Sequence, residues 1–353
     1  MKTIILTGGG TAGHTTPALA LVPKLKKYFD KIIYIGSKNG IEQDLAKKHG
    51  LEFYHVPTAK LERKLTVKNL SIPFTLFLGI REAKKLLKNF APSVVFSKGG
   101  YVSLPIVIAS KQLGIPVVSH ESDITVGLAN KIGAKYSNLF LTSFDCTQID
   151  CVRKVYTGSP INEKLFEQKD RKALLKKYNL SGRKKILLVF GGSSGSKFIN
   201  ENINKCLYKL VKRYEVVHLC GKGKNTGTKI KGYKEIEFTP NIDELFFLAD
   251  LVVSRAGANS LFELTALCKP TLAIPLPKGN SRGDQIDNAN YFEKRKLINV
   301  IHEEDLTPDD LYNAILILEN NALDLIENCK SRYFTLPNDK IVQLILKTAQ
   351  QTN

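Results

Sequence analysis

The residues of this chain that could do chemistry gather in glycine-rich stretches, each between an apolar run and a helical pattern. The first stretch, Gly8-Gly9-Gly10-Thr11-Ala12-Gly13-His14, follows the apolar run at residues 3–7. Glycines allow a backbone to approach a ligand closely, and the first turn of a helix offers unpaired N–H groups to an anion. The stretch therefore predicts a loop that faces a phosphate-bearing ligand.

Two similar stretches lie in the second half of the chain. They are Gly191-Gly192-Ser193-Ser194-Gly195 and Arg255-Ala256-Gly257-Ala258-Asn259-Ser260-Leu261-Phe262-Glu263. Ser260 could cap its helix or approach a phosphate, and Glu263 could accept two ribose hydroxyl groups. The alternative for Glu263 is an acid that only complements the helix dipole in the first turn. Neither loop has the Gly-Lys-Ser/Thr of a P-loop, which argues against ATP hydrolysis.

A nicotinamide-dependent dehydrogenase is a weak alternative. Gly8, Gly10 and Gly13 can be fitted to the dinucleotide pattern G-x-G-x-x-G, which also requires an acid at the end of the second strand. Asp30 instead precedes the second predicted strand, and a histidine directly after the glycines is unusual at such sites. We therefore do not favour this class of enzyme.

Short β-branched runs alternate with helical stretches, which is the pattern of a doubly wound α/β protein with parallel sheets. The predicted helices include Ala18–Lys27, Arg81–Asn89 and Leu261–Leu267. The predicted strands are Thr3–Thr7, Lys31–Ile35, Val94–Ser97, Val117–Ser119, Leu139–Thr142, Ile186–Phe190, Glu215–Leu219, Leu251–Ser254 and Thr271–Ile274.

The pattern restarts in the middle of the chain, which predicts two domains. A strand, a glycine loop and a helix occur at residues 3–14 and again at residues 186–198, with a Gly/Pro turn near Gly158–Asn162 between them. We expect one Rossmann-like domain at 1–160 and a second at 161–336. A C-terminal helix at about 337–353 is expected to pack back on the first domain.

The net charge and the cysteine content of the chain restrict the kinds of partner that it could bind. The formal net charge of +19 suits nucleic acid, an anionic membrane surface or a phosphate-bearing substrate, although a solvated lysine-rich surface needs no partner. No basic stripe interleaved with aromatic residues appears, so nucleic acid is not expected. The six cysteines are scattered without C-x-x-C, which predicts reduced thiols in a cytosolic protein and no metal site. No signal peptide is recognisable, and no apolar run approaches the ~20 residues of a spanning helix.

Seven loops in order resemble the MurG family, within glycosyltransferase family 28. They are GGGTAGH, SKGGYVSLP, HESDITVGLANK, TGSP, FGGSSGS, SRAGANSLFEL and SRGDQIDNA, and the resemblance runs from about Ile4 to Ala289. One such loop is weakly specific, but seven in order are highly specific, and HESD and SRGDQ resemble the Gram-positive-type form. The resemblance implies the GT-B fold, in which two Rossmann-like domains face each other across a cleft that holds the active site.

The resemblance also implies an activity. The enzyme would transfer N-acetylglucosamine from UDP-GlcNAc to the C4 hydroxyl of the N-acetylmuramyl unit of undecaprenyl-linked lipid I. The product would be lipid II, for peptidoglycan synthesis, made with inversion at the cytoplasmic face of the plasma membrane. The first domain would serve the acceptor and the membrane, and the second would bind the UDP-sugar.

The same resemblance assigns roles to residues. Gln285, with Asp284 beside it, would contact the donor sugar, although an ordinary polar loop is the alternative for both. Asn162 stands where family members typically carry Arg, and Lys164 could substitute for that Arg. The expected contacts with UDP-GlcNAc are Thr11, Ala12, Gly13, Asn162, Ser193, Ile242, Ala258, Ser260, Glu263, Asp284 and Gln285.

The implied reaction needs a base for the acceptor hydroxyl. An imidazole with a pKa near neutrality suits this task, so His14 is the leading candidate. A histidine that only binds backbone at the helix start is the alternative, and Glu121 and Asp123 are rival bases, with His120 orienting their loop. No D-x-D motif stands in a suitable place for a metal ion. Helix N-termini and glycine-loop amides could stabilise the leaving UDP, so neither metal nor cofactor is expected.

The stretch Leu70–Leu78 could contact a membrane. It is too short to span a bilayer but suits insertion into the interface. The expected contacts are Leu70, Ile72, Phe74, Leu76 and Phe77, and the alternative is a buried helix that packs on the sheet. Basic residues flank the stretch on both sides: Lys60, Arg63, Lys64 and Lys68 before it, and Arg81, Lys84, Lys85 and Lys88 after it.

Two other functions remain open from the sequence. Another GT-B glycosyltransferase, such as a diacylglycerol glycosyltransferase, would share the fold and the UDP site but differ in the acceptor loops. A non-catalytic UDP-sugar-binding protein would not need His14, Glu121, Glu263 and Gln285 together.

Overall fold

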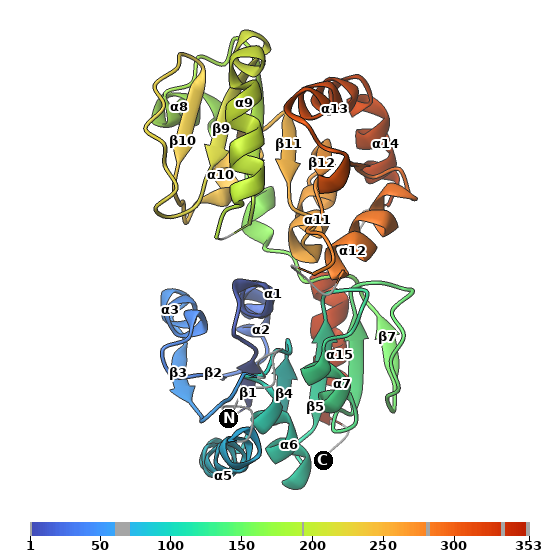
Figure 1. Ribbon diagram of the computed structural model, residues 1–353. Helices are drawn as coiled ribbons and strands as arrows, with labels where there is room; N and C mark the ends of the chain where they lie inside the picture. The colour runs from blue at the N-terminus through green and yellow to red at the C-terminus, as the bar shows by residue number, and fades with distance from the viewer. Residues whose placement is uncertain (1, 61–70, 193, 280–282, 333–335, 351–353) are drawn as a thin grey trace. The chain divides into compact units, whose positions relative to one another are not determined.

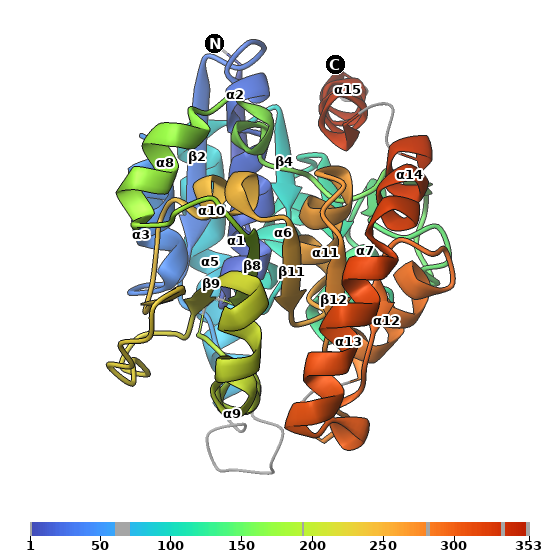
Figure 2. The same cartoon turned by 90° about the horizontal axis from the view of Figure 1, so that it is seen from above.

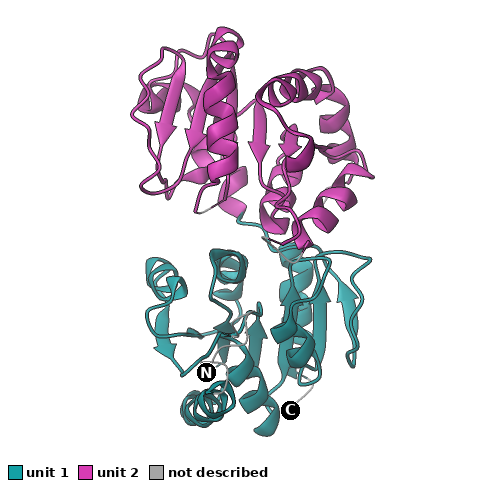
Figure 3. Cartoon of the chain, viewed as in Figure 1, with its two compact units in different colours: residues 1–162, 336–353 teal, residues 163–335 magenta. Residues whose placement is uncertain are grey.

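The computed structural model describes residues 2–60, 71–192, 194–279, 283–332 and 336–350. The chain divides into two compact units (Figure 3). Unit 1 comprises residues 1–162 and 336–353, and unit 2 comprises residues 163–335.

Unit 1 is built on a parallel sheet of seven strands in the order β3-β2-β1-β4-β5-β6-β7 (Figure 1). Its register places Ile5 of the central strand opposite Ile33 on one side and Val95 on the other. The strands are β1 (Thr3–Thr7), β2 (Lys31–Gly36), β3 (Glu52–His55), β4 (Val94–Ser97), β5 (Val117–Glu121), β6 (Leu139–Thr142) and β7 (Lys154–Tyr156).

Helices cover both faces of this sheet, because successive strand residues point to opposite faces. Ile4 joins a core that includes Leu19 and Ile341, whereas its neighbour Ile5 joins a core that includes Leu87 and Ile106. The helices are α1 (Ala12–Ala20), α2 (Val22–Leu25), α3 (Ile41–Lys48), α5 (Ile72–Phe90), α6 (Leu104–Gln112), α7 (Leu128–Ala134) and α15 (Pro337–Gln350).

The C-terminal helix α15 belongs to unit 1. The buried Asn338 side chain accepts from Ile161 N at 3.0 Å and donates to Ile161 O at 2.8 Å. Farther along, Ile341 and Ile345 enter the core beside β4. Unit 1 is therefore assembled from the two ends of the chain.

Unit 2 repeats the architecture with six parallel strands in the order β10-β9-β8-β11-β12-β13. The strands are β8 (Lys185–Phe190), β9 (Tyr214–Leu219), β10 (Tyr233–Ile236), β11 (Leu251–Ser254), β12 (Thr271–Ala273) and β13 (Asn299–Val300). Helices α9 and α13 lie side by side over one face and bury Ile203 and Ile315 against the sheet (Figure 2). The helical segments are η1 (Glu163–Phe166), α8 (Arg171–Tyr178), α9 (Lys197–Arg213), α10 (Ile242–Leu248), α11 (Ala258–Ala266), α12 (Asp284–Glu293), η2 (Glu303–Asp305), α13 (Pro308–Asn320) and α14 (Ala322–Arg332).

The predicted fold class, with two doubly wound parallel-sheet α/β parts, is confirmed. Two helical predictions need correction. The stretch Ala18–Lys27 spans parts of α1 and α2, and the helix expected from Arg81 already begins at Ile72. Within the described ranges, no helix is both long enough and apolar enough to cross a bilayer.

Candidate functional site

The glycine loops lie where the strand order of each sheet reverses. In unit 1, β1 is flanked by β2 and by β4, so the loops that follow β1 and β4 emerge side by side. In unit 2, the loops that follow β8 and β11 are related in the same way. Open parallel sheets bind ligands at such switch points, beyond the carboxyl ends of the strands. Each unit therefore carries a candidate site at this edge.

In unit 1, His14 lies in the first turn of α1, between these two loops. Its Nδ1 is 3.2 Å from the carbonyl oxygen of Lys98. A carbonyl only accepts, so Nδ1 carries the proton and the neutral ring keeps its lone pair on Nε2. Gly100 has φ +79°, and a Cβ there would lie 3.1 Å from the His14 ring. The predicted Thr11 and Gly13 are exposed at the same helix start, with Ala12 and His14 half-buried.

The rival base Glu121 is buried at the end of β5 and is engaged within its own loop. One carboxylate oxygen accepts from Ser122 N at 2.8 Å and Asp123 N at 3.2 Å. The other accepts from Gly127 N at 3.1 Å and Asn130 Nδ2 at 2.9 Å. These four contacts engage both oxygens of the Glu121 carboxylate within its own loop. This arrangement suits a residue that holds the loop, while Asp123 is half-buried beside it.

In unit 2, the loop after β8 leads into α9. Ser196 caps α9, because its hydroxyl accepts from Ile199 N at 3.3 Å. Gly195 has φ +69°, and a Cβ there would lie 2.0 Å from the carbonyl oxygen of Cys220. Ser193, a predicted contact, lies outside the described residues.

Arg255, directly after β11, was not among the site residues predicted from the sequence. Its buried guanidinium donates to Ser196 Oγ at 2.7 Å and to Ile274 O at 3.2 Å, and it pairs with Glu303. It thereby joins the loops that follow β8, β11 and β12. The only sequence signal for this role is an arginine inside a glycine loop directly after an apolar strand.

The helix α11 carries three predicted contacts. Ala258 is buried at its start, and Ser260 and Glu263 are half-buried one turn apart. Burial raises the pKa of Glu263 to about 7. Within the described residues, the Glu263 carboxylate has no hydrogen-bonding or ionic partner. A half-buried carboxylate of this kind is ready to accept hydroxyl groups from a ligand.

The other predicted donor contacts begin two helices of unit 2. Asp284 and Gln285 are the first residues of α12, and Gln285 Oε1 accepts from Leu276 N at 3.0 Å. Ile242 is the first residue of α10 and is half-buried.

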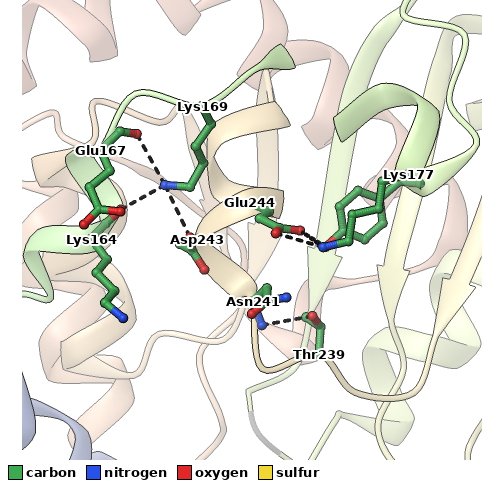
Figure 4. Close-up of polar contacts among 9 residues, drawn as sticks. Lys164, Glu167, Lys169, Lys177, Thr239, Asn241, Asp243 and Glu244 are labelled. Carbon is green, nitrogen blue, oxygen red and sulfur yellow. Dashed lines mark hydrogen bonds and ion pairs between the residues drawn. The ribbon is translucent and has the colours of Figure 1, made fainter. Parts of the chain in front are cut away.

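Neighbouring side chains fix the start of α10 (Figure 4). Asn241 N donates to Thr239 Oγ1 at 3.1 Å, and Asp243 pairs with Lys169 at 3.3 Å. Glu244 pairs with Lys177 at 2.6 Å. The backbone of Ile242 is therefore held from both sides.

Asn162, the last residue of the first segment of unit 1, is half-buried.

The predicted membrane contacts lie on α5, apart from Leu70, which is outside the described residues. The helix buries Gly79, Ala83 and Leu87 against the sheet. Phe74 and Phe77 point away from this buried face and are 66% and 62% exposed. Ile72 and Leu76 are half-buried.

No cluster of three or more His, Cys, Asp or Glu side chains that could hold a metal ion occurs among the residues the structure describes.

Comparisons with known proteins cover nearly the whole chain. The model of the glycosyltransferase family 28 N-terminal domain matches residues 4–141, and that of the C-terminal domain matches residues 186–345. A UDP-N-acetylglucosamine--N-acetylmuramyl-(pentapeptide) pyrophosphoryl-undecaprenol N-acetylglucosamine transferase from Clostridium perfringens (strain SM101 / Type A) is 44% identical over 351 residues, 98% of each chain.

Solved structures share the fold. The MurG structure from Acinetobacter baumannii has a TM-score of 0.75 at 23% identity and covers 98% of this chain and 100% of its own. The glycotransferase of kitacinnamycin has a TM-score of 0.77 at 16% identity and covers 99% of both chains.

Proposed function

The chain belongs to glycosyltransferase family 28, and from that premise we propose that it transfers N-acetylglucosamine from UDP-GlcNAc to undecaprenyl-linked lipid I, giving lipid II. The observation that carries this proposal is the 44% identity that extends over 98% of a relative with that printed activity. The transfer inverts the anomeric carbon of the donor sugar and joins it to the C4 hydroxyl of the N-acetylmuramyl unit.

Unit 2 binds the donor in this proposal. The carboxylate of Glu263, half-buried and without a partner among the residues that the structure describes, accepts the two ribose hydroxyl groups. Ser260 and the first turn of α11 receive the phosphates, because a helix start favours an anion. Gln285 and Asp284, at the start of α12, bind the sugar hydroxyl groups.

His14 acts as the general base in unit 1. Its tautomer, with the proton on Nδ1 and the lone pair on Nε2, is the one that can accept a proton from the acceptor hydroxyl. Glu121 is disfavoured as the base because both of its carboxylate oxygens are already engaged by donors of its own loop.

No metal ion takes part in the proposed transfer. As the glycosidic bond breaks, negative charge develops on UDP, and backbone N–H groups at the helix starts of unit 2 stabilise it. Chelation with EDTA should therefore leave the rate unchanged.

Unit 1 meets the lipid-linked acceptor at a membrane surface, so the protein is peripheral at the cytoplasmic face of the plasma membrane. Exposed Phe74 and Phe77 insert into the interface, and Arg81, Lys85 and Lys88 on the same helix attract anionic lipids. The positive formal charge of +19 adds to this attraction.

One assay tests the activity. Purified protein is incubated with radiolabelled UDP-GlcNAc and a lipid I analogue, with and without EDTA, and transfer is followed. We expect product in both conditions, and UDP-GlcNAc should be used about tenfold better than UDP-glucose or UDP-GalNAc, because contacts to sugar hydroxyls discriminate strongly.

Other outcomes of the assay identify the competing functions. Transfer to diacylglycerol in place of lipid I would indicate the glycolipid transferase. Binding of UDP-GlcNAc without transfer to either acceptor would indicate a non-catalytic protein.

A further inference from the structure

Lys98 is a fully buried lysine directly after β4, at the edge of unit 1 that carries His14. Its backbone N–H donates to Thr7 O at 2.8 Å, which continues the pairing of β1 with β4. Gly99 and Gly100 then turn the chain with φ of +84° and +79°. Gly8 packs over the side chain, since a Cβ there would lie 3.0 Å from Lys98 Cβ. The aliphatic stem is therefore enclosed by the two switch-point loops.

The amine of Lys98 reaches the loop that follows β5. Nζ lies 2.7 Å from His120 Nδ1 and 2.7 Å from Ser122 Oγ. His120 Nε2 lies 3.0 Å from Gly158 O, which can only accept, so Nε2 carries the proton and Nδ1 accepts from Lys98. The imidazole of His120 therefore links the amine of Lys98 to a third loop, which contains Gly158.

The carbonyl of the same residue meets His14 Nδ1 at 3.2 Å. One residue therefore contacts the proposed base through its backbone and the loop of Glu121 and Asp123 through its side chain.

Stability alone does not account for a lysine at this position. Burying a cation costs more than burying an apolar side chain of similar volume, even where hydrogen bonds compensate. Burial lowers the pKa of Lys98 to about 7, although the charges of Glu121 and Asp123 oppose the shift. Burial, with the charge of Lys98 adding to it, also keeps the pKa of His120 well below its usual range. Costly buried polar groups of this kind concentrate at functional sites.

We propose that Lys98 is a positioning residue for the acceptor half of the reaction, holding His14 and the loop 120–123 in one arrangement. This role rests on the proposed function. Lys98 touches neither substrate, because it is fully buried, and it acts through His14, His120 and Ser122.

The test compares Lys98→Met with Lys111→Met in the full-length protein. Methionine fills a similar volume without the donors, and Lys111 is an exposed lysine on α6 of the same unit. We expect Lys98→Met to lower kcat by about 10- to 100-fold, the effect of misplacing reacting groups. The KM for UDP-GlcNAc should stay within about twofold, since unit 2 binds the donor. Lys111→Met should change neither constant.

A spectroscopic measurement makes the test independent of turnover. The chain has six histidines, so their ring ¹⁵N signals can be assigned from single His→Gln variants. In the wild type we expect His120 with its proton on Nε2 and a hydrogen-bonded Nδ1. Lys98→Met should shift the Nδ1 signal of His120 and broaden or shift that of His14, and Lys111→Met should leave both in place.

The outcomes separate the two proposals. A wild type that does not glycosylate lipid I overturns the proposed function, while the histidine spectra still report on Lys98. An active, folded Lys98→Met enzyme with wild-type kcat, or with unchanged histidine signals, overturns the positioning role.

If Lys98→Met does not fold, Ser122→Ala replaces it in both measurements. This variant removes one acceptor of the amine and leaves the lysine in place. We expect a fall in kcat of about threefold to tenfold at constant donor KM, the effect of losing one neutral hydrogen bond. A wild-type kcat in this variant would equally count against the proposal.

Discussion

His14 lies in the first turn of α1, and its Nδ1 donates to the backbone carbonyl of Lys98, which leaves the lone pair of the neutral ring on Nε2. Replacing it with alanine should lower kcat by about 10²- to 10⁴-fold, the usual loss when a general base is removed. The Kd for UDP, measured by calorimetry, should stay the same, because unit 2 binds the nucleotide.

His49→Ala is the matched control for this change. His49 is an exposed histidine directly after the neighbouring helix α3, at its C-cap, and its removal should leave kcat unchanged. Activity of His14→Ala within a factor of a few of wild type would transfer the role of base to Asp123.

Glu263 should make donor binding depend on pH. Burial raises the pKa of its carboxyl group to about 7, and only the ionised form accepts both ribose hydroxyl groups well. The Kd for UDP should therefore fall as the pH rises from 6 to 8, and the Glu263→Gln variant should lose this dependence. Glu327→Gln, an exposed glutamate of α14, should behave as wild type.

The same carboxyl group should also make the free energy of unfolding depend on pH. Here the effect is opposite, because stability falls as the pH rises whereas donor binding strengthens. Its pKa in the folded protein is raised above the unfolded value, so the stability it contributes is fully present below the unfolded pKa. That contribution is lost as the pH rises through about 7, where the folded group must ionise. Urea unfolding of wild type and Glu263→Gln at pH 5 and pH 8 measures it, and parallel pH trends in the two proteins would contradict the raised pKa.

Glycine loops could be recognised from sequence because their residue types are local signals. The positioning residues could not, because their partners are far along the chain. Arg255 bonds Ser196, 59 residues earlier, and Lys98 bonds His120, 22 residues later. Only the sheet, which sets β8 beside β11 and β4 beside β5, brings these pairs together.

At the scale of elements, helix α5 packs one face against the sheet of unit 1 and exposes the opposite face, which carries Phe74 and Phe77. Changing Phe74 and Phe77 together to serine removes apolar area that is already exposed, so the thermal unfolding midpoint should hardly move. Sedimentation with anionic vesicles at low salt should weaken, because interfacial binding scales with the apolar area inserted.

Two exposed apolar residues of unit 2 provide the control for α5. Tyr208 and Leu323 are 72% and 74% exposed, and changing both to serine should leave vesicle binding intact. Equal loss of binding in both double variants would show that attraction is by charge or by general apolarity, and not by this helix.

The strands at the sheet edges were the ones that the sequence patterns did not predict. Every strand predicted from an apolar run is present, whereas β3, β7, β10 and β13 were not predicted. Each of these four lies at the edge of its sheet and pairs on one side only. A strand covered by helices and flanked by two neighbours is mostly apolar, but an edge strand such as Lys154–Tyr156 can carry charged and exposed residues.

At the scale of the whole molecule, α15 completes the core of unit 1. Ile341 and Ile345 are fully buried there, and each change from isoleucine to alanine in a core costs about 2–5 kcal/mol. In the double variant, amide hydrogen exchange should accelerate in β4 and β5 and stay unchanged in β8 and β11. Leu323→Ala, at an exposed position of α14, should alter neither unit, and uniform acceleration across both sheets would contradict this division.

Because α15 belongs to unit 1 but follows unit 2 in the chain, it also determines the order in which the two units can fold during translation. Residues 163–335 are contiguous, so unit 2 has all its parts once they leave the ribosome. Most of unit 1 precedes unit 2 in the chain, but its core is complete only once Ile341 and Ile345, which follow unit 2, have been made. The usual sequence of co-translational folding, N-terminal domain first, is thereby reversed. Until α15 has been made, the sheet of unit 1 lacks the cover that Ile341 and Ile345 provide, and we expect chaperones to bind the apolar surface left exposed.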